Sequence, residues 1–121
     1  MLAAIDRQLP RLPTGTTLVA VGFPGETAPG VPVFDATWDL EGALRLRYHD
    51  PRLSAFPLFA DGALTCTGAG AIAAAPGSFG RNTLSYRTLV IVSPAGHARI
   101  ASRASCERAV ADFPLRARLG G

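Results

Sequence analysis

Two cysteines carry the clearest chemical signal in this sequence. Cys66 and Cys106 are the only cysteines, and they lie 40 residues apart. A disulfide between them would stabilise the fold by about 3–4 kcal/mol and would require an oxidising compartment. The alternative is a pair of buried free thiols, which would suit a cytoplasmic protein. Neither cysteine belongs to a C-x-x-C motif, so the sequence favours neither a zinc site nor thioredoxin-type redox chemistry.

General acid–base chemistry has few candidate residues. His49 and Asp50 are adjacent, Asp39 and Glu41 lie upstream, and His97 is the second histidine. A carboxylate pair across a pocket can act as acid and base, but acidic residues at a predicted helix start more simply complement the helix dipole. The sequence shows no cluster with metal-ligand spacing. We therefore assign no catalytic residue, no metal ligand and no cofactor.

A glycine pattern resembles a nucleotide-binding loop. Residues 68–73 match G-x-G-x-x-A, but the dinucleotide fingerprint requires a strand before it and a full helix after it. Pro76 and Gly77 would interrupt such a helix after one or two turns. We interpret the match as accidental and predict a loop for residues 68–82.

The arginines are unevenly distributed. All 12 basic residues are Arg; residues 1–80 hold 5 Arg and 7 acids (net −2), and residues 81–121 hold 7 Arg and 2 acids (net +5). Such asymmetry is typical of contact with an anionic partner, although a solvated arginine face also explains it. Stacking aromatics are not interleaved with these arginines, so we expect no nucleic-acid partner. The candidate contacts with an anionic surface are Arg99, Arg103, Arg108, Arg116 and Arg118.

Two aromatic residues in the middle of the chain are candidates for sugar stacking. Trp38 and Tyr48 fall in one predicted helix, over residues 37–48. Exposed aromatic rings can stack on sugar rings, but with 9 aromatic residues in the chain, core packing competes for these two.

Hydrophobic spacing and turn signals predict the elements that would position these residues. Apolar residues at helical spacing predict a helix over 2–9 that Pro10 ends, and Thr37 can cap the second helix. Runs bounded by turn signals predict strands over 16–23, 53–59 and 64–67, with Pro57 placing the second of them at a sheet edge or bulge. A short strand at 33–34 is a further prediction.

The last third of the chain predicts a hairpin followed by a helix. Residues 86–93 and 98–101 read as two strands around the turn 94–97. Ser102 or Ser105 can then cap a helix, in which Cys106, Ala109 and Phe113 fall on one apolar stripe. With Cys106 on this stripe, Cys66 at a strand end could meet it.

These elements fit one domain. A chain of 121 residues is long enough for one hydrophobic core. We predict a single α/β (or α+β) domain over residues 1–121, with a small mixed β-sheet, two to three helices packed on it and a C-terminal β-hairpin–helix unit. The longest run without charges, between Asp61 and Arg81, contains Pro76 and five glycines and is no membrane span.

Three segments resemble a known kind of membrane-enzyme domain. They are TTLVAVGFP, TWDLEGALRLRY and the closing YRTLVIVSPAGHARIASRASCERAV. Together they resemble the soluble C-terminal region of polytopic bacterial glycosyltransferases of the dolichyl-phosphate-mannose mannosyltransferase-like type. The resemblance implies a fragment of a larger membrane protein, on the extracytoplasmic side of a bacterial membrane. In such enzymes the catalytic acid lies near the first transmembrane segments, so no catalytic residue carries over.

The expected function follows from this resemblance. It is a non-catalytic accessory or binding module of a membrane glycosyltransferase that acts on lipid-linked sugars. Its partners would be the membrane-embedded remainder of the parent protein and a lipid-linked sugar or cell-envelope glycan. Two alternatives stay open. The first is a pseudopilin-like structural subunit of a secretion or pilus system, because residues 86–101 are also similar to the closing strands of minor pseudopilins. The second is a small cytosolic enzyme with reduced cysteines.

Overall fold

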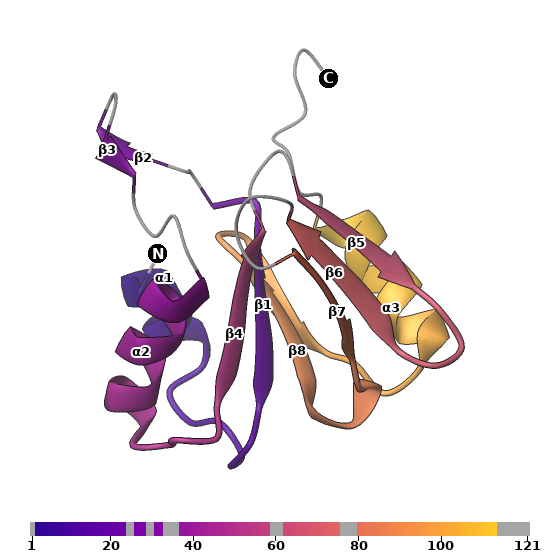
Figure 1. Ribbon diagram of the computed structural model, residues 1–121, viewed down its shortest axis with the longest axis horizontal. Helices are drawn as coiled ribbons and strands as arrows, with labels where there is room; N and C mark the ends of the chain where they lie inside the picture. The colour runs from indigo at the N-terminus through magenta and orange to yellow at the C-terminus, as the bar shows by residue number, and fades with distance from the viewer. Residues whose placement is uncertain are drawn as a thin grey trace.

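The two inner strands of the central sheet are apolar and almost completely buried. The computed structural model describes residues 2–23, 26–28, 31–32, 37–58, 62–75 and 80–113. Strand β1 (Thr17–Val21) pairs in parallel with β4 (Ser54–Leu58) on one side and with β8 (Leu89–Ser93) on the other. Strand β9 (Gly96–Arg99) returns antiparallel to β8. The strand order is β4-β1-β8-β9, which confirms the predicted mixed sheet and hairpin (Figure 1).

Two helices cover one face of this sheet. They are α1 (Leu2–Gln8) and α2 (Thr37–Tyr48), and Figure 1 shows both on the same side of β1 and β4. Because side chains alternate along a strand, one set of residues faces these helices. The buried residues of this layer, called the helix-side core, are Ile5, Leu9, Leu18, Ala20, Phe23, Leu40, Leu44, Leu53, Ala55, Val90 and Val92.

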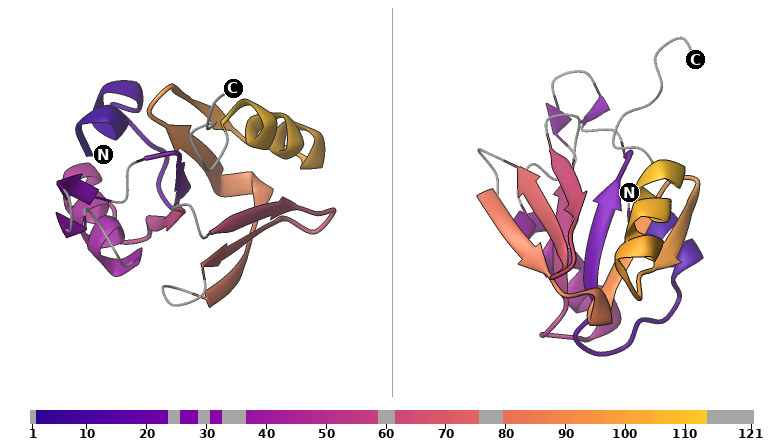
Figure 2. Two further views of the ribbon diagram at one scale, coloured as in Figure 1. Left: turned by 90° about the horizontal axis from the view of Figure 1, so that it is seen from above. Right: turned by 90° about the vertical axis from the view of Figure 1, so that its right-hand side faces the viewer.

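A second sheet and a third helix cover the opposite face. Strands β5 (Ala63–Cys66), β6 (Ala71–Ala75) and β7 (Gly80–Leu84) form an antiparallel sheet in the order β5-β6-β7. Helix α3 (Arg103–Asp112) lies beside it, as both views of Figure 2 show. The buried residues here form the sheet-side core: Val19, Val21, Leu58, Ala71, Ala73, Ala75, Leu84, Leu89, Ile91, Ile100, Cys106 and Ala109. The central sheet is therefore buried on both faces, which explains its continuous apolar strands.

The prediction of a loop over residues 68–82 is wrong. This segment contains β6 and the start of β7. Alanine has a low intrinsic strand propensity, so local pattern gives no warning of β6. The strand forms because it is the central strand of its sheet and buries Ala71, Ala73 and Ala75 on one face. The glycines of the G-x-G-x-x-A match lie in the turn before a strand, not before a helix.

Most of the remaining boundaries agree with expectation to within a few residues, but the hairpin turn is shorter than predicted, because β9 runs from Gly96 to Arg99 and not over 98–101. Pro57 lies in β4, an edge strand, where its missing N–H is tolerated. The predicted strand over 86–93 begins only at Leu89, because Tyr86–Thr88 form a short 3-10 helix, η1, that Ser85 caps. Two further short strands, β2 (Glu26–Ala28) and β3 (Val31–Pro32), pair with each other. The strand predicted at 33–34 lies outside the described residues.

Candidate functional site

A disulfide fastens α3 to the second sheet. Cys66, the last residue of β5, is bonded to Cys106 of α3, with the Cα atoms 5.9 Å apart. The predicted pairing is thereby confirmed. Ser102 and Ser105 form a capping box at the start of α3, which fixes where the helix begins and so places Cys106 on its inner face. Cys106 is fully buried, and the bond joins this buried position to the edge strand β5.

The arginines of α3 lie on an exposed surface. Arg103 pairs with Glu107 one turn later, with 2.9 Å between Nε and Oε1, and both side chains are more than half exposed. Such pairs contribute little free energy and are screened by salt. Arg108 is exposed on the same helix. The predicted anionic contacts Arg116 and Arg118 lie outside the described residues.

Arg99 is also exposed, but it lies beside a hollow in the surface. It lines a hollow of about 200 Å³, called the arginine hollow, at the end of the central sheet where β1 and β8 begin. The hollow also receives Thr14 and Thr16 from the turn before β1, and Arg87 and Thr88 from η1. Within the described part of the chain, no acidic side chain lines it.

The hairpin register brings Arg87 and Arg99 to the same hollow. Arg99 is opposite Val90 in the β8–β9 pairing, and the backbone N–H of Ile100 donates to the carbonyl of Leu89 at 3.0 Å. Arg87, two residues before Leu89, therefore lies at the same end of the hairpin as Arg99. Sequence reasoning missed Arg87, because the predicted turn at 94–97 would place Arg99 opposite Val92, five residues from Arg87, instead of opposite Val90.

A buried carboxylate holds the wall of the arginine hollow in place. Asp50 is 7% exposed, and its Oδ2 accepts from the backbone N–H of Gly15 at 2.9 Å. Its Oδ1 accepts from the backbone N–H of Arg52, also at 2.9 Å. Thr16 is buried, and its hydroxyl donates to the carbonyl of Pro13. Asp50 thus connects the end of α2 to the turn that carries Thr14.

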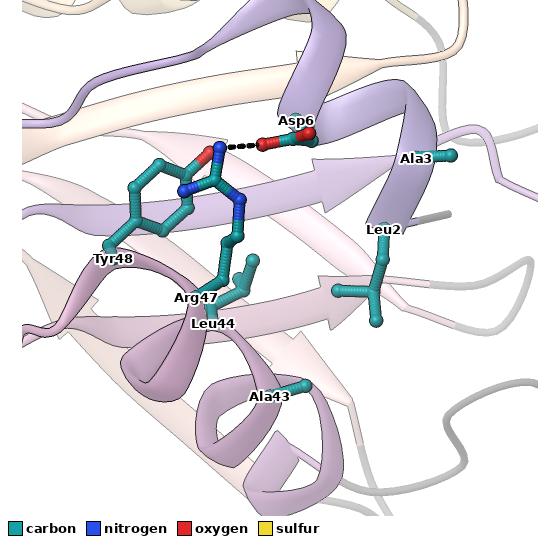
Figure 3. A pocket seen from close by; sticks show the side chains of 7 residues that line it. All are labelled: Leu2, Ala3, Asp6, Ala43, Leu44, Arg47 and Tyr48. Carbon is teal, nitrogen blue, oxygen red and sulfur yellow. Dashed lines mark ion pairs between the residues drawn. The ribbon is translucent and has the colours of Figure 1, made fainter.

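A second pocket, mostly apolar, lies between α1 and α2. Its volume is about 270 Å³, and its lining comes from Leu2, Ala3, Asp6, Ala43, Leu44, Arg47 and Tyr48 (Figure 3). Arg47 forms an ion pair with Asp6 across the pocket, and its guanidinium carbon lies 5.2 Å from the centre of the Tyr48 ring. Arg47 therefore covers one face of the Tyr48 ring, which the sequence analysis considers for sugar stacking.

Tyr48 is also held at its hydroxyl. The hydroxyl donates to the backbone carbonyl of Leu9. Burial raises the pKa of Tyr48, the charge of Arg47 lowers it, and the charge of Asp6 raises it further; the net direction is upward. Stacking on a sugar would have to use the ring face away from Arg47. The side chain of Trp38, the other predicted stacking residue, lies outside what the structure describes.

One histidine and one further carboxylate have contacts that hold neighbouring elements together. His49 is exposed at the end of α2 with φ of 52°, and Nδ1 of His97 lies 3.0 Å from Oε1 of Gln8. Glu41 pairs with Arg45 and accepts from the backbone N–H of Ala55 in β4. Glu41 thereby links α2 to the sheet. The side chain of Asp39 lies outside the described residues.

Across the described ranges, no three His, Cys, Asp or Glu side chains gather so that they could hold a metal ion. None of the helices in the described part of the chain is both long enough and apolar enough to cross a membrane.

Comparison with known proteins adds no relative. No protein-family model, no curated protein and no solved structure matches the chain. The resemblance to glycosyltransferase C-terminal regions therefore remains a hypothesis.

Proposed function

We propose that this chain is a non-catalytic accessory module on the extracytoplasmic side of a bacterial membrane. Its parent would be a polytopic glycosyltransferase that acts on lipid-linked sugars, and the module would position a partner or an acceptor such as a cell-envelope glycan. The observation that carries the proposal is the Cys66–Cys106 disulfide. Such bonds persist in oxidising compartments and are rare in the cytosol.

Three further features support the proposal. The segments TTLVAVGFP and TWDLEGALRLRY, which carry the resemblance, form β1 and α2 and so belong to the folded core. Asp50 and Glu41 accept backbone N–H groups and so hold the elements around them in place. The hollow beside Arg87 and Arg99 offers a positive surface to a phosphate-bearing partner.

The coding sequence upstream of Met1 is the first test. The proposal predicts a reading frame that continues upstream through many membrane-spanning segments. A single apolar helix would instead support the pseudopilin-like structural subunit, and a stop codon directly upstream would support a small cytosolic enzyme. Either of these results would overturn the proposal.

Glycosyl transfer is the second test. Membranes from cells that produce the parent should transfer sugar from a polyprenyl-phosphate donor, whereas the purified 121-residue chain should show no turnover with the same donor. Deleting the module from the parent should lower transfer to the natural acceptor. Full transfer by the purified chain would contradict a non-catalytic role, and full transfer by the deleted parent would contradict an accessory role.

A further inference from the structure

We propose that the arginine hollow binds a single phosphate group through Arg87, Arg99 and the hydroxyls of Thr14 and Thr88. The inference that an oxyanion binds here stands on the geometry alone. Its assignment to the phosphate of a lipid-linked sugar rests on the proposed function.

The charge of the hollow is positive and is not neutralised locally. Arg87 and Arg99 both line it, and the described part of the chain gives neither an ion pair. By contrast, Arg103 pairs with Glu107, Arg47 with Asp6 and Arg45 with Glu41. The carboxylate of Asp50, which fastens the turn that carries Thr14, already accepts backbone N–H groups with both its oxygens. Two guanidinium groups without acidic partners can each donate two hydrogen bonds to a phosphate.

The threonines around the arginines differ in the protons they can donate. Thr16 donates its hydroxyl to Pro13 and has none left for a ligand. Thr14 has no hydroxyl hydrogen bond within the described residues. The hydroxyls of Thr17 and Thr88 lie 3.1 Å apart and share one hydrogen bond, so when Thr17 is the donor, the Thr88 proton is free. The hollow thus adds two hydroxyl donors, Thr14 and Thr88, to the two guanidinium groups.

The size and rigidity of the hollow suit a small oxyanion. A volume of about 200 Å³ holds about six water molecules at roughly 30 Å³ each, and therefore one tetrahedral oxyanion with a few waters. Its walls come from strand ends and from a turn that a buried carboxylate fastens. Since the backbone of the walls is already ordered, binding would have to order only side chains, chiefly the two exposed arginines. Arg103 and Arg108, which are equally exposed, do not line this hollow.

Titration with inorganic phosphate tests the site directly. Amide shifts of the isotope-labelled chain would be followed while chloride keeps the ionic strength constant. We expect the largest shifts at Thr88, Leu89 and Ile100, which surround the hollow. Arg87→Gln and Arg99→Gln should each weaken binding about tenfold, because each removes a charge-assisted hydrogen-bond donor.

Arg108→Gln is the matched control. It removes the same charge from α3, away from the hollow, and should change the affinity by less than about twofold because salt screens distant charges. Thermal unfolding of all three variants would confirm that each is folded. Equal weakening by Arg99→Gln and Arg108→Gln, or absence of amide shifts around the hollow, would overturn the proposal.

Two more probes distinguish the source of the phosphate. A sugar 1-phosphate presents the group on a soluble ligand, and phosphatidylcholine vesicles doped with phosphatidylglycerol present it on a lipid surface. Arginine-dependent binding of either probe supports the site and names the source. If phosphate binds but the coding sequence upstream of Met1 holds no membrane spans, the site stands and the proposed function fails. If the spans are present but phosphate does not bind, the site fails alone.

Discussion

The two faces of the central sheet are stabilised in different ways. The helix-side core consists mainly of large aliphatic residues, with Ile5, Leu18, Leu40, Leu44 and Leu53 almost completely buried. The sheet-side core contains the alanines of β6, and a disulfide crosses it. Burial of a leucine or isoleucine contributes about 1.5–3 kcal/mol, and alanine offers much less apolar area. Both sides depend on packing, because the sheet-side core also buries Leu58, Leu89 and Ile91, but only the sheet side adds a covalent bond.

Removal of the disulfide should have the largest effect. We expect the Cys66→Ala–Cys106→Ala double variant to lose about 3–4 kcal/mol of unfolding free energy, since it frees a loop of 40 residues in the unfolded chain. Denaturant unfolding measures the total loss. Hydrogen exchange should show that α3 and β5 lose more protection than β1 and α2. An equal loss of protection on both faces would contradict the claim that the disulfide mainly stabilises the sheet side.

Close packing in the β5–β6 turn should give the next largest effect. A Cβ added at Gly70, where φ is 153°, would lie 2.4 Å from the carbonyl oxygen of Leu84. Gly70→Ala should therefore destabilise the protein by about 2–3 kcal/mol, through backbone strain and overpacking of the sheet. The measurement is again denaturant unfolding.

Gly68 supplies the matched control in the same turn. Its added Cβ would meet no atom within 4 Å, so Gly68→Ala should change the free energy of unfolding by less than about 0.5 kcal/mol. Similar losses in the two variants would mean that the turn, and not the approach of β6 to β7, limits the stability of the sheet side.

Backbone strain at the end of α2 offers a smaller, stabilising change. His49 has φ of 52°, a left-handed conformation that glycine adopts without the steric cost. We expect His49→Gly to raise the unfolding free energy by about 0.5–1 kcal/mol, measured by thermal or denaturant unfolding. His49→Ala, which keeps the strain, should have almost no effect. Stabilisation by alanine as well would show that the imidazole, not the backbone, is unfavourable on the helix side.

The smallest effect should appear only at alkaline pH. Burial holds the pKa of Tyr48 above its ordinary value of 10.0 in the folded protein. Below pH 10 the phenol is protonated in both states, so its contribution to stability is constant. As the pH rises further, the unfolded chain loses this proton first, and the contribution is lost as the pH passes through the raised pKa of the folded state.

Comparison of Tyr48→Phe with the unaltered chain isolates this effect. We subtract the unfolding free energy of Tyr48→Phe from that of the unaltered chain. This difference should be constant well below pH 10 and should fall as the pH rises through and beyond 10. Tyr86 is present in both proteins and cancels. A rise of this difference above pH 10 would mean that the folded protein favours the ionised phenol beside Arg47. The pocket between α1 and α2 would then be less apolar than its lining suggests.

Much of the fold could be predicted because local signals agree with tertiary structure. The apolar run at β1 predicts a buried strand, and the capping serine predicts where α3 begins. The proline of β4 predicts that this strand lies at an edge of the sheet. The disulfide could be predicted because Cys106 falls on the apolar stripe of its helix and so faces the sheet. Strand β6 could not be predicted, since five residues of Ala and Ile carry no alternation of polarity and the strand depends on pairing with β5 and β7.

The candidate site was predicted only in part, for a different physical reason. Charge along the chain indicates which segment is basic, but not which arginines have acidic partners. Arg103 and Arg99 look equivalent in sequence, yet Glu107 neutralises the first and no described acid neutralises the second. The closeness of Thr14 to Arg87 depends on the parallel pairing of β1 with β8, which no local pattern specifies.

The oxidation state of the two cysteines in the producing cell tests the central claim most directly. Cells would be quenched with acid, and the protein treated with a thiol-reactive polyethylene glycol maleimide before and after reduction. An extracytoplasmic module with a structural disulfide predicts no labelled cysteine before reduction and two after it. Two labelled cysteines in the unreduced sample, in a protein that is otherwise folded, would contradict the account.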